Sequence, residues 1–166
     1  MTPEQGKLLA QVFISTIQNE TETTKKVIRA VPEDKKSYKP DPKSMTANDL
    51  AWHIATSECW FLGGVLAGKF DMSGAQPAPP SSIRGIVEWY ETNHRDLLNK
   101  LKDLPAENLV KPVTLFPGME LPVVAYLNML NLHSSHHRGQ LSAYLRPMGA
   151  KVPSIYGGSA DEPMQH

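Results

Sequence analysis

Two histidines stand four residues apart near the C-terminal end of the chain, in the segment HSSHHRGQLSAYLR. If this segment is helical, His133 and His137 lie on one face and can direct their imidazoles to one point in space. This is the spacing of a pair of metal ligands, but a stable site needs at least one more. The third ligand must come from another part of the chain.

His53 is the first candidate for that third ligand. It follows Leu50 by three residues and precedes Ile54, so it lies at or beside the apolar stripe of its own segment. His94 is a weaker candidate, because it stands among polar residues and could equally face water at a helix boundary. The sequence therefore predicts a metal site formed by His53, His133 and His137.

Other residues have a weaker case as ligands. His136 is adjacent to His137 and about 100° from it around a helix axis, so it is expected behind the ligands or on the surface. Cys59 is expected on another helix face, as a small buried hydrophobic residue. The carboxylates of Asp49 and Glu58 stay open as additional contributors to the site.

A different interpretation of the histidines is also open. One histidine on an apolar stripe is more often a hydrogen-bonded core residue than a ligand, and this interpretation fits His53 taken alone. Burying His133 and His137 in place of leucines, without partners, would be costly in free energy, and this favours an ion. Five aromatic residues could wall a pocket but are expected mostly in the core: Trp52, Trp60, Tyr90, Tyr126 and Tyr144.

The elements that must position these residues lie between prolines, because proline interrupts a helix. The 14 prolines leave four long gaps, each wide enough for a helix: 4–31, 43–76, 81–104 and 123–146. Thr2, Pro3 and Gln5 predict the start of the first helix through a capping box. The apolar pattern of that helix is thinned in its middle by Thr and Glu, which suggests a polar pocket.

The segments that connect the helices are too short to form a sheet or a second domain. The segment VTLFPGMELP predicts an extended turn or a small hairpin, and residues 71–82 predict a loop. We therefore expect an all-α fold, a four-helix bundle formed by residues 1–166 as a single domain. The tail after Pro147 has no clear helical pattern, and His166 at its end is expected to be disordered.

Composition limits the classes of function. Hydrophobic residues make up 40% and charged residues 20%, as in an ordinary globular protein. Lys plus Arg equal Asp plus Glu at 17 each, so nucleic acid is not an expected partner. A single cysteine excludes an internal disulfide, and no apolar run approaches the roughly 18 residues of a membrane helix. We expect a cytoplasmic protein that does not associate with membranes.

Three segments together resemble the DinB/YfiT-like superfamily, and the resemblance spans most of the chain: MTANDLAWHIATSE, LFPGMELP and HSSHHRGQLSAYLRPMG. The resemblance implies a four-helix bundle in up-down-down-up order. It also implies a metal held by one histidine of the second helix and two of the last, which correspond to His53, His133 and His137. Residues 138–140 also match the motif of the family, but the sequence does not indicate what role they have.

An open metal site favours chemistry over a purely structural role. Three imidazoles leave at least one position on the ion for water or a substrate. Zinc or nickel is the first expectation, while iron, manganese, cobalt and copper stay open. The resemblance implies a metal-dependent transferase or hydrolase, with a low-molecular-weight thiol as a further cofactor, and a homodimer; the substrate is not defined. The alternative is a metal-binding stress-response or regulatory bundle without turnover.

Overall fold

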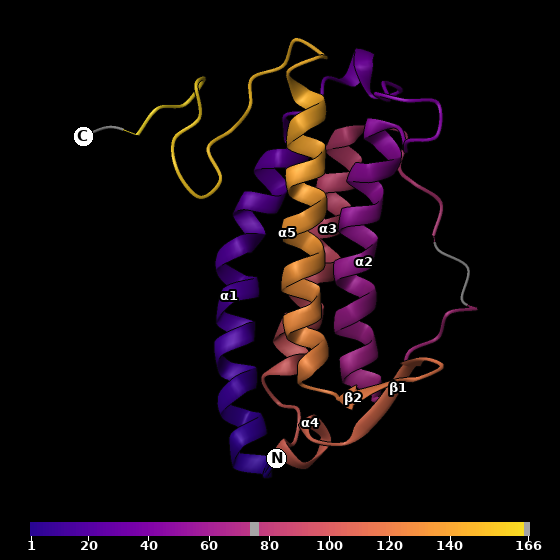
Figure 1. Ribbon diagram of the computed structural model, residues 1–166, viewed down its shortest axis with the longest axis vertical. Helices are drawn as coiled ribbons and strands as arrows, with labels where there is room; N and C mark the ends of the chain where they lie inside the picture. Colours follow the sequence, from indigo (N-terminus) through magenta and orange to yellow (C-terminus); the bar gives the residue numbers. More distant parts are fainter. Residues whose placement is uncertain (74–76, 165–166) are drawn as a thin grey trace.

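The computed structural model describes residues 1–73 and 77–164. Four long helices form an antiparallel bundle: α1 (Pro3–Arg29), α2 (Ala47–Ala67), α3 (Ile83–Leu101) and α5 (Ala125–Leu145). In Figure 1, α1 runs upward from the N-terminus, α2 and α3 both run downward, and α5 runs upward again. The all-α bundle and its up-down-down-up order are thus confirmed. Because α2 and α3 run in the same direction, the end of α2 and the start of α3 lie at opposite ends of the bundle.

Side-chain caps fix where the helices begin. Thr2 accepts a hydrogen bond from the backbone N–H of Gln5, whose side chain accepts one from the backbone N–H of Thr2, completing the predicted capping box of α1. Thr46 caps α2 by accepting from the N–H of Asp49 at 3.0 Å. Ser82 caps α3 in the same way. The start of α1 therefore agrees with the prediction from the sequence.

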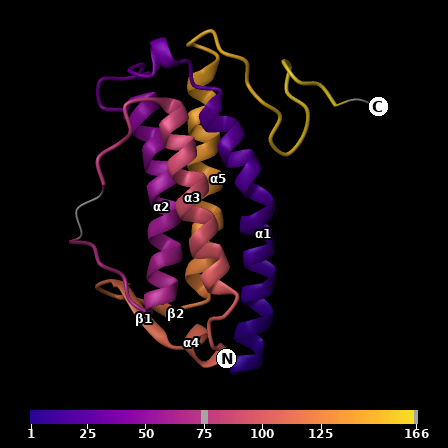
Figure 2. The same cartoon turned by 180° about the vertical axis from the view of Figure 1, so that it is seen from behind.

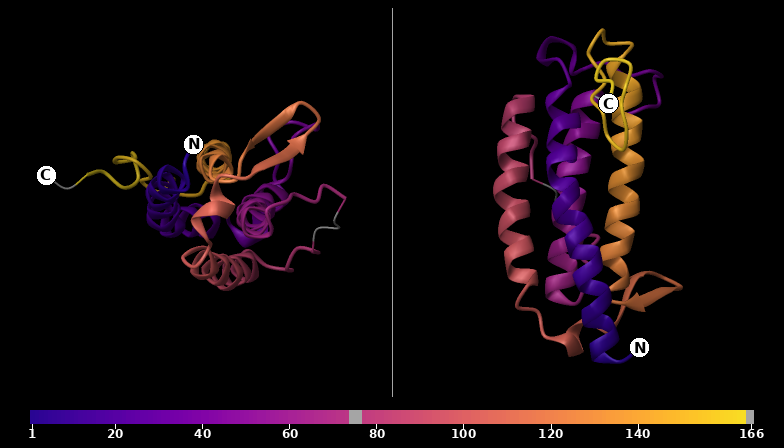
Figure 3. Two further views of the ribbon diagram at one scale, coloured as in Figure 1. Left: turned by 90° about the horizontal axis from the view of Figure 1, so that it is seen from below. Right: turned by 90° about the vertical axis from the view of Figure 1, so that its left-hand side faces the viewer.

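Short elements close the two ends of the bundle. A 3₁₀ turn, η1 (Glu33–Lys35), follows α1 at one end. At the other end lie α4 (Ala106–Leu109), which the sequence did not predict, and the hairpin of β1 (Pro112–Phe116) and β2 (Met119–Pro122). Figure 3 shows the hairpin projecting sideways from the bundle end. The predicted hairpin is therefore present, and it lies beside the ends of α2 and α5.

The core consists of two apolar clusters with polar residues between them. One cluster includes Ile28, Leu50 and Leu145, and the other includes Ile17, Leu62 and Leu127. The buried polar side chains come from all four long helices: Thr24, Lys25, Thr56, Ser57, Glu58, His94, Ser134 and Arg138. The polar middle of α1 thus faces a packed polar layer, where the sequence suggested a pocket.

The glycines of α2 do not end the helix early. The helix continues through Gly63 and Gly64 and ends at Gly68, whose φ of 61° is the left-handed conformation of a helix C-terminus. Gly64 lacks a side chain because the ring of Phe70 packs directly against its backbone; a Cβ atom there would lie 2.2 Å from Phe70 Cε1. The glycine permits a close contact that any larger residue would prevent.

Beyond α5, the described residues up to 164 contain no helix or strand. This tail turns back beside the upper part of α1 (Figure 2). Lys26 of α1 forms an ion pair with Glu162 at 2.5 Å, and Arg146 forms one with Asp161 at 2.7 Å. The prediction for His166 lies outside the described residues. Within residues 1–73 and 77–164, none of the helices has the length and apolar character that crossing a membrane requires.

Candidate metal centre

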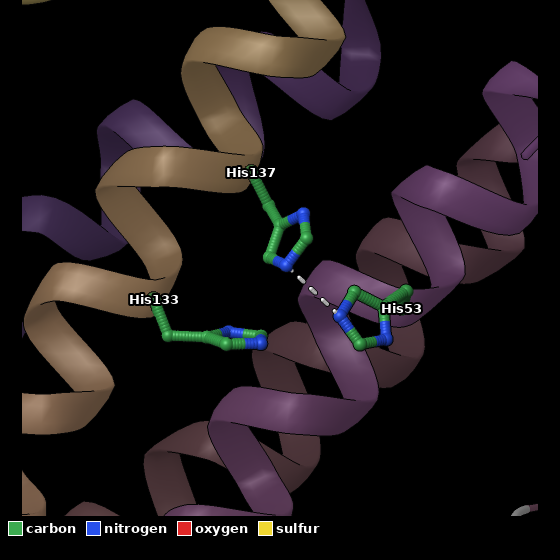
Figure 4. A group of neighbouring side chains, drawn as sticks. All are labelled: His53, His133 and His137. Atoms are coloured by element: carbon green, nitrogen blue, oxygen red, sulfur yellow. Dashed lines mark hydrogen bonds between the residues drawn. The ribbon is translucent and has the colours of Figure 1, made fainter. Parts of the chain in front are cut away.

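Three histidines from two helices converge on one point. His53 projects from α2, and His133 and His137 project from successive turns of α5 (Figure 4). One ring nitrogen of each lies within 4.8 Å of the others, and all three side chains are partly buried. The shortest approach, 3.2 Å, joins His53 Nε2 to His137 Nε2. The structure therefore brings together the three residues that the sequence selected as ligands.

Local packing explains this convergence. Leu50 and Ile54 of α2 are fully buried, so His53 between them is turned toward the neighbouring helix. On α5, residues four apart lie on one face, and the ring centroids of His133 and His137 are 4.4 Å apart. The two helices pack side by side and hold the rings across their interface (Figure 4).

Two side chains fix which nitrogen of each α5 histidine carries its proton. His137 Nδ1 lies 2.9 Å from Gln140 Oε1, and because an amide oxygen only accepts, Nδ1 must donate. Ser57 donates its own proton to the Ile54 carbonyl, so its oxygen accepts from His133 Nδ1 across a long contact of 3.5 Å. Both arrangements leave Nε2 unprotonated, so that His137 Nε2 can accept the 3.2 Å hydrogen bond from His53 Nε2 or can bind a metal instead.

The three imidazoles are neutral at pH 7. Burial, followed by the neighbouring imidazoles of His137 and His53, lowers the pKa of His133 to about 4. Burial also lowers the pKa of His53, with His137 adding to the effect. It lowers the pKa of His137, although the hydrogen bond with Gln140 opposes this shift. Neutral rings offer their lone pairs to a cation at physiological pH.

The arrangement fits a transition metal ion. Metal–nitrogen bonds of about 2.0–2.1 Å in tetrahedral coordination place ligand nitrogens about 3.3 Å apart. The 3.2 Å between His53 and His137 already matches this spacing, while the more widely separated nitrogens, at up to 4.8 Å, would have to move closer. Three imidazoles would leave at least one position for another ligand.

The other proposed contributors lie apart from this cluster. His136 is exposed, with its ring edge-on to that of His137 at a centroid distance of 4.8 Å. Cys59 is buried, and burial raises the pKa of its thiol, with the charge of Glu58 adding to the shift. Asp49 is exposed in the first turn of α2. Among the described residues, none of the three joins the histidine cluster.

Glu58 lies in the buried polar layer behind the histidines. Its carboxylate accepts hydrogen bonds from Tyr90 at 2.6 Å, Ser134 at 2.7 Å and Thr24 at 3.3 Å. His94 is fully buried, not exposed at a helix boundary, with Nε2 3.1 Å from the same carboxylate. Burial by itself raises the pKa of Glu58, but the contacts with His94, Tyr90 and Ser134 outweigh it and hold the pKa below its usual value. The carboxylate is therefore charged and does not point at the metal site.

Arg138 extends the polar layer to α1 and the tail. It is 1% exposed, donates to Thr24 at 2.8 Å and to the hydroxyl of Tyr156 at 2.6 Å, and pairs with Glu20. Ser134 and Arg138 have the same four-residue spacing as the two histidines that precede them. That spacing indicates a second polar stripe on α5, which was not among the predictions from the sequence.

A cavity of about 340 Å³ opens beside the histidines. Its lining combines two of the histidines with mostly apolar residues from α2, β1, α5 and the segment after α2: His53, Ser57, Trp60, Phe61, Asp71, Met72, Leu115, Phe116, Met129 and His133. Only one of the aromatic residues expected to wall a pocket, Trp60, lines this cavity. Tyr90, Tyr126 and Tyr144 are buried in the core, as expected.

Comparisons with known proteins agree with this architecture. A model of the DinB family matches residues 4–165. Protein YrdA of Bacillus subtilis (strain 168) is 24% identical over 154 residues, which cover 90% of this chain and 89% of YrdA. The crystal structure of the DinB-like protein YjoA from Bacillus subtilis matches with a TM-score of 0.71 and 24% identity, covering 86% of this chain and 96% of YjoA. A DinB-like protein from Bacillus cereus ATCC 10987 matches with a TM-score of 0.73 and 28% identity, covering 87% of this chain and 95% of its own.

Proposed function

Since this chain belongs to the DinB family, we propose that it binds one divalent transition metal ion through His53, His133 and His137. The observation that carries the proposal is the convergence of three neutral, half-buried imidazoles whose ring nitrogens lie within 4.8 Å of one another. Gln140 and Ser57 support it, because they orient two of the rings with Nε2 free. An all-imidazole donor set favours zinc or nickel, with iron, manganese and cobalt as further candidates.

Elemental analysis of the purified protein, prepared without added metal or chelator, tests this proposal. We expect about one transition metal ion per chain, lost when His133→Ala and His137→Ala are combined. His136→Ala is the matched control, because His136 is exposed and outside the cluster, so this variant should keep its metal. Wild-type protein that lacks metal and also fails to bind added Zn²⁺ or Ni²⁺ would contradict the proposal.

We further propose that the protein is a metal-dependent enzyme of the thiol-transferase or hydrolase type. The cavity beside His53 and His133 supports a catalytic role, because it gives a small molecule access to the histidines. A bound divalent ion would act as a Lewis acid and would activate water or a thiol for attack on an electrophile. Assays should combine several low-molecular-weight thiols with a panel of electrophiles, and should include esters and amides for hydrolysis.

The second candidate is a metal-binding protein without turnover. It is favoured by the origin of the ligands, since an ion held by His53 and the α5 histidines would tie α2 to α5. If that is the only role, His53→Ala should lower the melting temperature of the metal-loaded protein substantially and no substrate should be found. In a catalytic site, His53→Ala would abolish turnover at a smaller loss of stability. The homodimer and the cytoplasmic location stay predictions, for light scattering and cell fractionation to test.

A further inference from the structure

We propose that the cavity beside the three histidines binds an uncharged small molecule with an aromatic or bulky apolar body, whose polar end faces His53 and His133. This inference names the class of substrate and rests on the proposed function. It follows from the wall, the rim and the charge of the cavity.

The wall of the cavity is mostly apolar, and its polar residues besides the two histidines are Ser57 and Asp71. Phe61, Leu115 and Met129 line it from α2, β1 and α5. The ring of Phe61 lies edge-on to the ring of His133, with their centroids 5.7 Å apart. A ligand that fills the cavity would therefore contact mostly hydrocarbon and could direct a polar group toward the imidazole nitrogens of His53 and His133.

The aromatic part of the wall is held in place before any ligand binds. The indole N–H of Trp60 donates to the backbone carbonyl of Asp71 at 3.0 Å. The Trp60 ring packs against Phe61 and Phe70 at centroid distances of 5.1 and 5.0 Å. A wall fixed in this way loses little conformational freedom when a flat ligand binds against it.

The rim of the cavity exposes large apolar side chains to solvent. Met72, from the segment after α2, is 60% exposed, and Phe116, at the end of β1, is 46% exposed. Both line the same cavity although they come from separate segments. Exposed apolar side chains gathered at the entrance of an apolar cavity are typical of a site that takes up apolar molecules.

The charge of the lining disfavours an anionic group on the part of a ligand that lies away from the histidines. Among the described residues that line the cavity there is no lysine or arginine, and the acidic residue Asp71 is present. Away from the histidine end, where the proposed metal ion would lie, a carboxylate, sulfonate or phosphate on the ligand body would be desolvated without a cation to pair with it. Peptide-like thiols that carry several carboxylates are thus unsuited to this cavity, which favours a neutral electrophile as its occupant.

Two fluorescent probes with the same ring skeleton test the proposal. N-phenyl-1-naphthylamine is neutral, and 8-anilino-1-naphthalenesulfonate is the same skeleton with a sulfonate. Titration of the chelator-treated protein should show at least about tenfold tighter binding of the neutral probe, because without a bound ion the sulfonate would be buried unpaired. Equal or tighter binding of the sulfonate would overturn the proposal.

Two charge substitutions at the rim locate the bound probe. Phe116→Arg should weaken binding of the neutral probe and strengthen binding of the sulfonate, and Met72→Arg should do the same from the other segment of the rim. Both positions are exposed, so at least one folded variant is expected, as judged by circular dichroism. Leu8→Arg is the matched control, because Leu8 is 63% exposed on α1 and does not line the cavity. Rim variants that bind both probes like the control would place the probes elsewhere and overturn the proposal.

The same titrations separate this inference from the proposed function. Tight binding of the neutral probe to a protein that holds no metal would support the cavity assignment while the metal proposal fails. A protein that holds one ion per chain but does not discriminate between the probes would keep the metal site and refute the substrate class.

Discussion

Among the three clustered histidines, His133 has the most strongly shifted pKa, which burial and two neighbouring imidazoles lower to about 4. An unfolded histidine has a pKa of about 6.5, so between these two values the unfolded chain binds more protons than the folded one. In the metal-free protein, the contribution of this residue to the free energy of unfolding should be complete above about pH 6.5 and should disappear as the pH falls toward 4. Because the ring is half exposed and solvent weakens the effect, we expect the free energy of unfolding to fall by up to about 2 kcal/mol.

Urea denaturation of chelator-treated protein at a series of pH values measures this loss. His133→Asn removes the titrating ring, so its free energy of unfolding should fall less steeply between pH 6.5 and 4 than that of the wild type. Identical slopes for both proteins would show that His133 does not carry the pH dependence. Titrating groups that do not contact His133 affect both proteins alike and cancel in the comparison.

Gln140 positions a ligand without binding the ion itself. It accepts from His137 Nδ1 at 2.9 Å and so directs Nε2 of that ring toward His53. Gln140→Ala should weaken Zn²⁺ or Ni²⁺ binding about tenfold, the lower end of the range for such partners. Gln140→Glu keeps an acceptor and should restore most of the affinity, as measured by competition with a chromophoric chelator.

Gly139→Ala is the control for the Gln140 variants. Gly139 is exposed, and a Cβ atom there would meet nothing within 4 Å outside its own helix. Its metal affinity should equal that of the wild type. If Gln140→Ala also binds metal like the wild type, the orientation of His137 does not depend on the amide.

At the scale of one helix, Gly63 and Gly64 of α2 form a natural pair for comparison. A Cβ atom at Gly64 would lie 2.2 Å from Phe70 Cε1, and that ring packs against Trp60 and lies 4.6 Å by centroid from Tyr126. Gly64→Ala must therefore displace a packed aromatic ring and should destabilise the protein by about 1–3 kcal/mol.

Gly63→Ala should have the opposite effect. A Cβ atom at Gly63 would meet nothing within 4 Å, so alanine would only remove the unfavourable helix propensity of glycine, worth about 0.5–1 kcal/mol. Chemical denaturation of the two variants measures both effects. Equal changes in stability would mean that the Phe70 contact does not constrain α2.

The elements differ in how far local sequence determines them. The start of α1 at Thr2 was predictable, because a cap depends only on residues within the next turn. The helix α4 was not predicted, since its four residues, Ala106–Leu109, are too few for a periodic pattern. Periodicity thus identifies a long helix but not a single turn.

For the candidate site, too, the sequence predicts local geometry but not contacts between helices. The spacing of His133 and His137 predicted that they share a face, and the structure places His53 opposite them. Their role as metal ligands stays a prediction. The burial of His94 could not be predicted, because it depends on Glu58 of a different helix lying 3.1 Å away. A periodic pattern shows which face of a helix is apolar but does not identify the residues packed against it.

At the scale of the whole molecule, the buried polar layer joins all four long helices between the two apolar clusters. Glu58 of α2 contacts Thr24 of α1, His94 of α3 and Ser134 of α5, and Arg138 links the layer to the tail through Tyr156. Ser134 directly follows the ligand candidate His133. The layer therefore fixes the position of α5 relative to α2, and with it the spacing of the histidines.

Glu58→Gln tests this coupling between the buried layer and the metal site. The substitution keeps the size of the side chain but removes the buried charge and turns one of the oxygens that accept from Thr24, Tyr90 and Ser134 into a donor, so we expect a destabilisation of about 1–3 kcal/mol. Metal affinity should fall as well, because the turn of α5 that carries His133 is no longer held against α2. Denaturation and chelator competition measure the two effects.

Glu88→Gln is the control on the surface of α3. Glu88 pairs with Arg84 in an exposed i,i+4 ion pair, and such a pair contributes little to stability because water screens it. A Glu58 variant that is destabilised no more than this control would show that the layer does not stabilise the bundle. A strongly destabilised Glu58 variant that keeps full metal affinity would show that the histidines are held by contacts between α2 and α5 alone, such as those of Ser57 with His133, and not by the buried charges behind them.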